Sequence, residues 1–169
     1  MGFFTPDYMF TKTVNIGEDF LAEKGIKNLL LDVDNTLTTH DNPAPAEGIT
    51  RWIEKMQAAG VNLIIVSNNS DERVKPFADL LGLSYTHDAA KPLPKGFNEA
   101  MKKLGASTEN TAVVGDQIFT DVLGAHRRGL PILMVKPIEL ETKWTFKIKR
   151  PLEKPFVKRY LKKHGGYVK

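Results

Sequence analysis

Two aspartates at alternate positions after an apolar run are the residues of this sequence best suited to chemistry. Asp32 and Asp34 flank Val33 and follow Leu29–Leu31. The apolar run predicts a buried strand, and alternate residues of an extended chain point to the same side. Two carboxylates placed in this way repel each other unless a cation or a bound phosphate compensates them. The pair therefore predicts a metal site.

Further polar residues follow the other strands that the sequence predicts. The predicted strands span residues 28–34, 61–66, 83–86, 111–115 and 131–135. Helical patterns alternate with them at 47–59, 70–81, 95–104 and 119–128, which predicts an α/β fold with a five-stranded, mainly parallel sheet. Ligands of such sheets bind beyond the carboxyl ends of the strands. The polar residues at those ends are Asp32, Asp34, Thr36, Ser67, Asn68, Asn69, Lys91, Asp116, Gln117 and Asp121.

These residues, taken in order, resemble the motifs of the haloacid-dehalogenase superfamily of phosphatases. The D-x-D-x-T pattern is Asp32 to Thr36, the hydroxyl after the second strand is Ser67, the lysine is Lys91, and the G-D-x-x-x-x-D pattern is Gly115 to Asp121. The match covers residues 27–135 and is similar to subclass IIIA, in particular its YqeG-like branch, which is related to phosphatidylglycerophosphate phosphatases. The resemblance implies a three-layer Rossmann-like fold.

The resemblance also implies a role for each residue. Asp32 would attack phosphorus to form an aspartyl-phosphate, and Asp34 would act as acid and base. Mg²⁺ would bind Asp32, the backbone carbonyl of Asp34 and Asp116. The remaining implied roles are phosphoryl binding by Ser67, Lys91 and the backbone near Asn68, support of the loop by Thr36, and orientation of Lys91 or a metal-bound water by Asp121.

Each residue also has a simpler structural explanation when it is considered alone. Asp34 and Asp121 could cap a turn or a helix, Ser67 could be a turn hydroxyl, and Lys91 could be a solvated surface lysine. The four motifs together, each at the end of a strand and in the right order, favour the catalytic interpretation. The four histidines share no metal-ligand spacing and are predicted to lie on the surface.

The spacing of the motifs leaves no room for a cap domain. Residues 38–60 provide a loop and one helix, and residues 69–91 provide one helix and one short strand. The predicted site is therefore open, which suits a large or surface-anchored phosphorylated substrate such as an anionic phospholipid. Hydrolysis of soluble nucleotides or sugar phosphates, and a non-catalytic phosphate-binding scaffold, remain as alternatives. The oligomeric state is not indicated.

Composition narrows the class of protein. The 169 residues predict a single domain, with a core at about 27–135 and an extension at 136–169. The absence of cysteine excludes disulfides and thiolate chemistry. No apolar stretch has the length of a membrane span, so we expect a cytoplasmic protein.

The extension carries a strong positive charge. Residues 136–169 contain eleven Lys or Arg against three acids, whereas the whole chain has a net charge of +4. This basic tail could contact an anionic membrane peripherally, bind RNA or form a solvated helix. Without a nucleic-acid-binding module in the sequence, we expect no nucleic acid partner.

Overall fold

A parallel sheet forms the centre of the molecule. The computed structural model describes residues 2–139 and 144–168, so residues 140–143 and 169 of the predicted extension lie outside the described part. The strands are β1 (Tyr8–Phe10), β2 (Asn28–Leu31), β3 (Asn62–Val66), β4 (Ser84–Thr86), β5 (Thr111–Gly115) and β6 (Ile132–Val135). Their order is β1-β6-β5-β2-β3-β4, and each described pairing is parallel.

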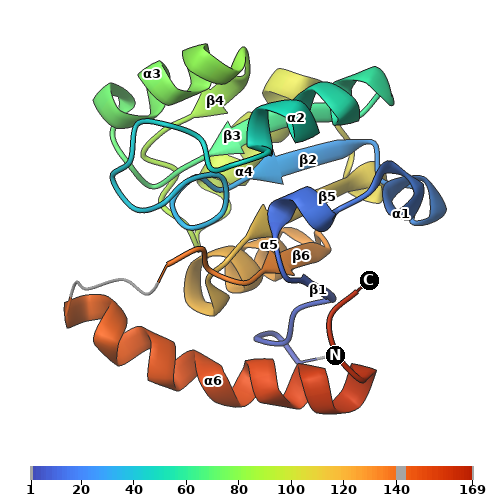
Figure 1. Cartoon of the computed structure of the whole chain (residues 1–169), viewed down its shortest axis with the longest axis vertical. Coiled ribbons are helices and arrows are strands. Elements are labelled where there is room, and N and C mark those ends of the chain that lie inside the picture. Colours follow the sequence, from blue (N-terminus) through green and yellow to red (C-terminus); the bar gives the residue numbers. More distant parts are fainter. Residues whose placement is uncertain (1, 140–143, 169) are drawn as a thin grey trace.

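Helices cover both faces of this sheet (Figure 1). They are α1 (Glu18–Glu23), α2 (Ile49–Ala58), α3 (Asp71–Leu81), α4 (Lys95–Leu104), α5 (Leu123–Arg128) and α6 (Trp144–His164). Short helical turns lie at Thr13–Asn15, Thr108–Asn110 and Ile118–Val122.

The alternation of side chains along the strands explains the three layers. In β2, Leu29 and Leu31 pack in one core with Trp52 of α2 and Phe77 of α3. Leu30 belongs to a second core on the opposite face of the sheet, which includes residues of α4, α5 and α6. Both faces of the strand are thus apolar, as expected for a central parallel strand covered on both sides. The predicted three-layer α/β fold is confirmed.

Three details differ from the sequence prediction. The sheet has six strands rather than five, because β1 pairs with β6 at one edge. This strand is only three residues long and too short to show a periodic pattern. β2 ends at Leu31, so Asp32 and Asp34 lie in the loop after the strand rather than on it.

The third difference concerns α6. The prolines predicted an irregular tail with a short helix at 156–163, yet α6 is 21 residues long and contains both Pro151 and Pro155. The two prolines are exposed, whereas Glu153 and Tyr160 are buried against the rest of the molecule. Packing of one face can compensate for the backbone hydrogen bonds that proline removes.

The loops beside the predicted site hold no inserted domain. Residues 32–48 and 67–90 are fully described and contain, apart from irregular backbone, only α3 and β4. As for membrane insertion, none of the helices in the described ranges combines the length and the apolarity that crossing a bilayer requires.

Candidate active site

A buried lysine joins two aspartates at the carboxyl edge of the sheet. Lys91 Nζ lies 2.6 Å from Asp32 Oδ1 and 2.7 Å from Asp121 Oδ1. All three side chains are less than 10% exposed, with values of 3% for Lys91, 9% for Asp32 and 0% for Asp121. The sequence places Lys91 59 residues after Asp32, and the fold makes them neighbours because the two loops follow strands of the same sheet.

Burial controls the protonation of this group. Burial raises the pKa of Asp32 to about 7, although the Lys91 ammonium acts in the opposite direction. For Lys91, burial lowers the pKa, but the carboxylates of Asp121 and Asp32 outweigh it and hold the pKa above its usual value. Lys91 therefore stays charged. The pKa of Asp32, by contrast, lies close to neutral pH.

The loop after β3 fixes the backbone of Lys91. The Asn68 side chain accepts a hydrogen bond from Lys91 N at 2.7 Å and donates one to Lys91 O at 3.1 Å. Ser67 is buried, and its Oγ accepts a hydrogen bond from Asn69 N at 3.1 Å. This is the turn geometry that the simpler explanation of Ser67 predicted. Its hydroxyl can still donate, so phosphoryl binding by Ser67 stays a prediction.

Asp34 has a different set of partners from Asp32. Its Oδ2 accepts a hydrogen bond from Asn69 Nδ2 at 2.5 Å, and its Oδ1 accepts one from Arg73 Nη2 at 3.1 Å. His40 Nδ1 lies 3.6 Å from Asp34 Oδ2. The two aspartates therefore have different hydrogen-bonding partners. Asp32 contacts the buried Lys91, whereas Asp34 contacts Asn69 and Arg73 at the rim of the site.

Asp116 is fully buried beside the same loops. Thr36 Oγ1 lies 3.5 Å from its Oδ1, and Thr36 O accepts a hydrogen bond from Thr13 Oγ1 at 2.6 Å. Arg150 of α6 forms an ion pair with Asp116 Oδ2. Burial holds the pKa of Asp116 well above its usual range despite this guanidinium. Thr36 therefore lies where it can support both the loop and Asp116.

The buried carboxylates fit a hard divalent cation. Asp32, Asp116 and Asp121 each offer one oxygen, and these oxygens lie within 4.8 Å of one another. Oxygen donors of this kind are the ligands that Mg²⁺ prefers. The Asp34 carboxylate is not part of this group; the sequence prediction for Asp34 concerned its backbone carbonyl, and it stays a prediction.

A small cavity opens onto these residues. Its volume is about 170 Å³. The residues that line it are Asp32, Asp34, His40, Asn68, Asn69, Lys91, Gln117, Thr120 and Lys149. A larger cavity of about 400 Å³ is lined by Thr36 but by none of the predicted catalytic carboxylates. The small cavity is therefore the one that Asp32, Asp34 and Lys91, which the sequence predicts to react or bind phosphate, line together.

Sequence reasoning missed several residues of this site. His40 was predicted to be an ordinary surface histidine, but it lines the cavity. Arg73, Lys149 and Arg150 were not predicted to belong to the site at all. The charge of Arg73 at the start of the helix after Ser67 was a usable signal for an anion-binding site. Lys149 and Arg150 lie outside every motif, so the sequence held no signal that they belong to the site.

Comparison with known proteins identifies the family. The sequence matches the haloacid dehalogenase-like hydrolases over residues 7–129. The chain belongs to this family. YqeG of Bacillus subtilis, a probable phosphatase, is 35% identical over 152 residues, which are 90% of this chain and 88% of that protein. The predicted family and the enzyme class of phosphatase are confirmed.

One further relative and one solved structure show how far the likeness extends. Phosphatidylglycerophosphate phosphatase 1 of Arabidopsis thaliana is 26% identical over 155 residues, which are 86% of this chain but 44% of that protein. The cobalt-bound deoxy-D-mannose-octulosonate 8-phosphate phosphatase of Haemophilus influenzae superposes with a TM-score of 0.51 at 16% identity, covering 81% of this chain and 90% of that one. The second likeness supports the haloacid dehalogenase fold alone.

Proposed function

We propose that this phosphatase hydrolyses phosphomonoesters through an aspartyl-phosphate on Asp32, with Mg²⁺ as its cofactor. The observation that carries the proposal is the position of Asp32 in the cavity, bound to Lys91 on one side and adjacent to Asp116 on the other. A bound divalent cation would be held by Asp32, Asp116 and the carbonyl of Asp34, and it would supply positive charge to the phosphoryl oxygens.

The first step is attack by Asp32 on phosphorus. Lys91 contacts Oδ1, so we assign Oδ2 as the attacking oxygen. The bond between Oδ2 and phosphorus forms as the bond to the leaving oxygen breaks, and Asp34 gives that oxygen a proton. Lys91 and the backbone around Asn68 balance the charge of the phosphoryl group.

The second step releases phosphate. Asp34, now a carboxylate, takes a proton from a water molecule that attacks phosphorus, which breaks the bond to Asp32 and restores it. Asn69 and Arg73 hold the Asp34 side chain in one place for both proton transfers. Asp121 holds Lys91 towards Asp32 and accepts a hydrogen bond from Gln117 N at 3.1 Å.

We further propose that the substrate is an anionic phospholipid such as phosphatidylglycerophosphate. A cavity of about 170 Å³ is below the usual range for a site that encloses a small molecule, so it suits a phosphoryl group whose carrier stays outside. The relative from Arabidopsis thaliana is named for this activity. The intact Asp32, Asp34, Lys91 and Asp116 argue against a non-catalytic scaffold.

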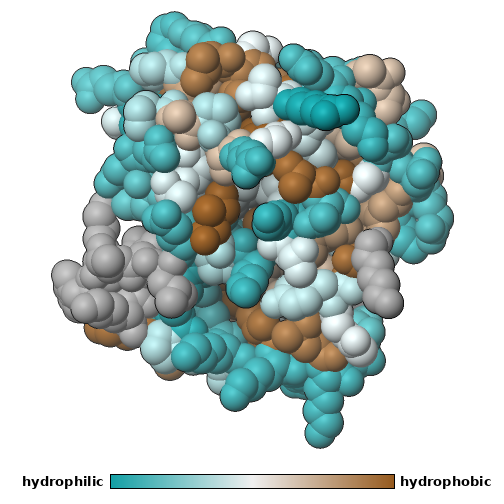
Figure 2. All heavy atoms as spheres, viewed as in Figure 1, coloured by the Kyte–Doolittle hydropathy of each residue, from teal (hydrophilic) through white to brown (hydrophobic). Residues whose placement is uncertain are grey.

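The surface of α6 supports peripheral contact with a membrane. Hydrophilic side chains gather on the side of α6 that faces away from the sheet (Figure 2). The exposed basic residues of α6 beyond the active-site cavity are Lys154, Lys158, Arg159, Lys162 and Lys163. Ile148 and Leu152 are also exposed, at 54% and 57%, one helical turn apart. Basic residues with apolar neighbours bind anionic lipid surfaces, and on this basis we propose that the protein binds peripherally at the cytoplasmic side of a membrane.

Phosphate release across a substrate panel tests both proposals. The panel contains vesicles with phosphatidylglycerophosphate, soluble sugar phosphates and nucleotides, each with Mg²⁺ or with EDTA. We expect Mg²⁺-dependent turnover of the lipid and no turnover by Asp32→Asn. Activity that survives in Asp32→Asn refutes the mechanism, and turnover confined to the soluble compounds refutes the lipid substrate.

A further inference from the structure

The C-terminal helix α6 reaches into the metal-binding end of the active site. Arg150 Nη2 forms an ion pair with Asp116 Oδ2, and Arg150 Nη1 donates a hydrogen bond to Asp116 O at 3.0 Å. One guanidinium therefore contacts both the side chain and the backbone of Asp116. Arg150 lies beyond residue 129, where the match to the haloacid dehalogenase-like hydrolases ends.

A second residue of α6 completes the arrangement. Glu153 accepts a hydrogen bond from Arg150 Nη1 at 3.0 Å and, through Oε1, another from Ile118 N at 2.8 Å. Glu153 is only 4% exposed. Arg150 and Glu153 thus bind the backbone on both sides of Gln117, in the loop that carries Asp116 away from β5.

The contact leaves one oxygen of Asp116 for another partner. Arg150 holds Oδ2, while Oδ1 is on the side of Thr36 in the loop after β2. Asp116 is fully buried with Arg150 in place, so the guanidinium rather than bulk water is the partner of Oδ2. Fixing one oxygen and the backbone carbonyl also fixes the rotation of the carboxylate, and hence the direction of Oδ1.

We propose that Arg150, itself held by Glu153, is a positioning residue of the metal site that aims Asp116 Oδ1 at the cation. This inference rests on the proposed function, since it assumes that a divalent cation binds at Asp116. Residues that hydrogen-bond to a metal ligand and orient it raise the metal affinity, and their removal lowers that affinity by about 10- to 100-fold.

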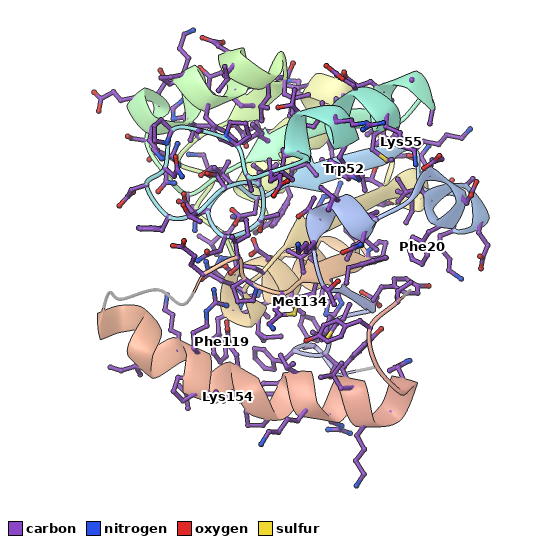
Figure 3. The ribbon with its side chains drawn as sticks, viewed as in Figure 1. Phe20, Trp52, Lys55, Phe119, Met134 and Lys154 are labelled. Atoms are coloured by element: carbon purple, nitrogen blue, oxygen red, sulfur yellow. The ribbon has the colours of Figure 1, made fainter. Side chains whose placement is uncertain are left out.

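Anchoring of α6 does not by itself require this contact. The Tyr160 hydroxyl accepts a hydrogen bond from Met9 N at 3.2 Å, far along the helix from Arg150. Phe156 packs against Phe4, with ring centroids 5.3 Å apart, and Phe4 packs against Phe119, which Figure 3 labels between the sheet and α6. These contacts hold the helix by other means, so the two roles can be separated by mutation.

The test is the affinity for Mn²⁺, a paramagnetic substitute for Mg²⁺, measured by electron paramagnetic resonance on the full chain without substrate. We expect Arg150→Gln to weaken Mn²⁺ binding by about 10- to 100-fold, and Glu153→Gln to weaken it less. Arg150→Lys keeps the charge but not the fork that spans Asp116 and Glu153, so we expect it to restore only part of the affinity.

Two control variants make the result specific. Arg51→Gln removes the same charge from an exposed position of α2, and Tyr160→Phe loosens α6 without touching the metal site. We expect both to bind Mn²⁺ as the unmodified protein does. Equal or tighter binding by Arg150→Gln, or an equal loss in Tyr160→Phe, overturns the role of Arg150. Absence of Mn²⁺ binding in the unmodified protein refutes the proposed function itself, and this inference with it.

Discussion

Replacing Lys91 by methionine removes the cation that two buried carboxylates share. Lys91 Nζ lies within 2.7 Å of both Asp32 and Asp121, and neither carboxylate has free access to water. Loss of one partner from a buried ion pair costs about 3–5 kcal/mol, because a charge stays buried without compensation. For a chain of this size each kcal/mol corresponds to about 2–4 °C, so we expect Lys91→Met to lower the melting temperature by about 6–20 °C at pH 8 in EDTA.

The cost has a defined dependence on pH. The pKa of Asp32 is already raised to about 7 while Lys91 is present, and loss of the ammonium raises it further. A carboxyl whose folded pKa exceeds its unfolded pKa gains stability as the pH falls, since the folded state binds the proton more tightly. Protonation neutralises the uncompensated charge, so the difference between Lys91→Met and the unmodified protein should shrink between pH 8 and pH 5.

Urea denaturation followed by circular dichroism at pH 5, 6.5 and 8 measures this difference. Lys102→Met is the matched control, because Lys102 is an exposed lysine of α4; we expect it to change the free energy of unfolding by less than about 0.5 kcal/mol at each pH. A penalty for Lys91→Met that is equal at pH 5 and pH 8, or larger at pH 5, would refute the assignment of a buried carboxylate–lysine network.

Two further predictions concern residues behind the site and at the N-terminal segment. A Cβ on Gly115 would overlap the Asp121 carboxylate, so Gly115→Ala should lower the free energy of unfolding in urea by about 1–3 kcal/mol and reduce phosphate release. Gly17→Ala is the control, because its Cβ meets no atom within 4 Å, and it should change neither stability nor activity. Equal effects of the two substitutions would contradict the packing of Gly115 against Asp121. The Asp7 carboxylate raises the pKa of His126, 2.9 Å away, so the stability from this pair is complete below the unfolded pKa of about 6.5 and falls as the pH rises through the higher folded value. His126→Gln should therefore lower the melting temperature more at pH 6 than at pH 9, and the reverse order would contradict the assignment.

The carboxyl edge of the sheet was predictable because it depends on local patterns. Runs such as Leu29–Leu31 predict strands, and the residues that follow them must meet if the strands are parallel. Lys91 and Asp32 could be expected close together for this reason alone. The contact of Lys91 with Asp121 is one of the two roles that the family resemblance implied for Asp121. The strand pattern alone could not choose between them, because the ion pair depends on how the two loops pack.

The contributions of α6 were beyond such reasoning. Arg150 is 34 residues from Asp116 and belongs to a helix whose prolines predict an interruption. The burial of Glu153 and Tyr160 and the packing of Phe156 against Phe4 show how that helix is held against the rest of the chain. Similarly, β1 is a strand because β6 lies beside it, not because of its own three residues. Propensity is overridden wherever tertiary contacts supply the missing stabilisation.

The position of β1 has a consequence for synthesis of the protein. β1 is the first strand to leave the ribosome, yet its partner in the sheet, β6, is the last. Met9 O also accepts a hydrogen bond from Val168 N–H at 2.7 Å, which can form only after Val168 has been synthesised. The two ends of the chain lie close together (Figure 1). Pairings between distant parts of a chain form slowly. The strands β2 to β5 can therefore pair first, while the edge formed by β1 closes only once β6 and the segment around Val168 have been synthesised.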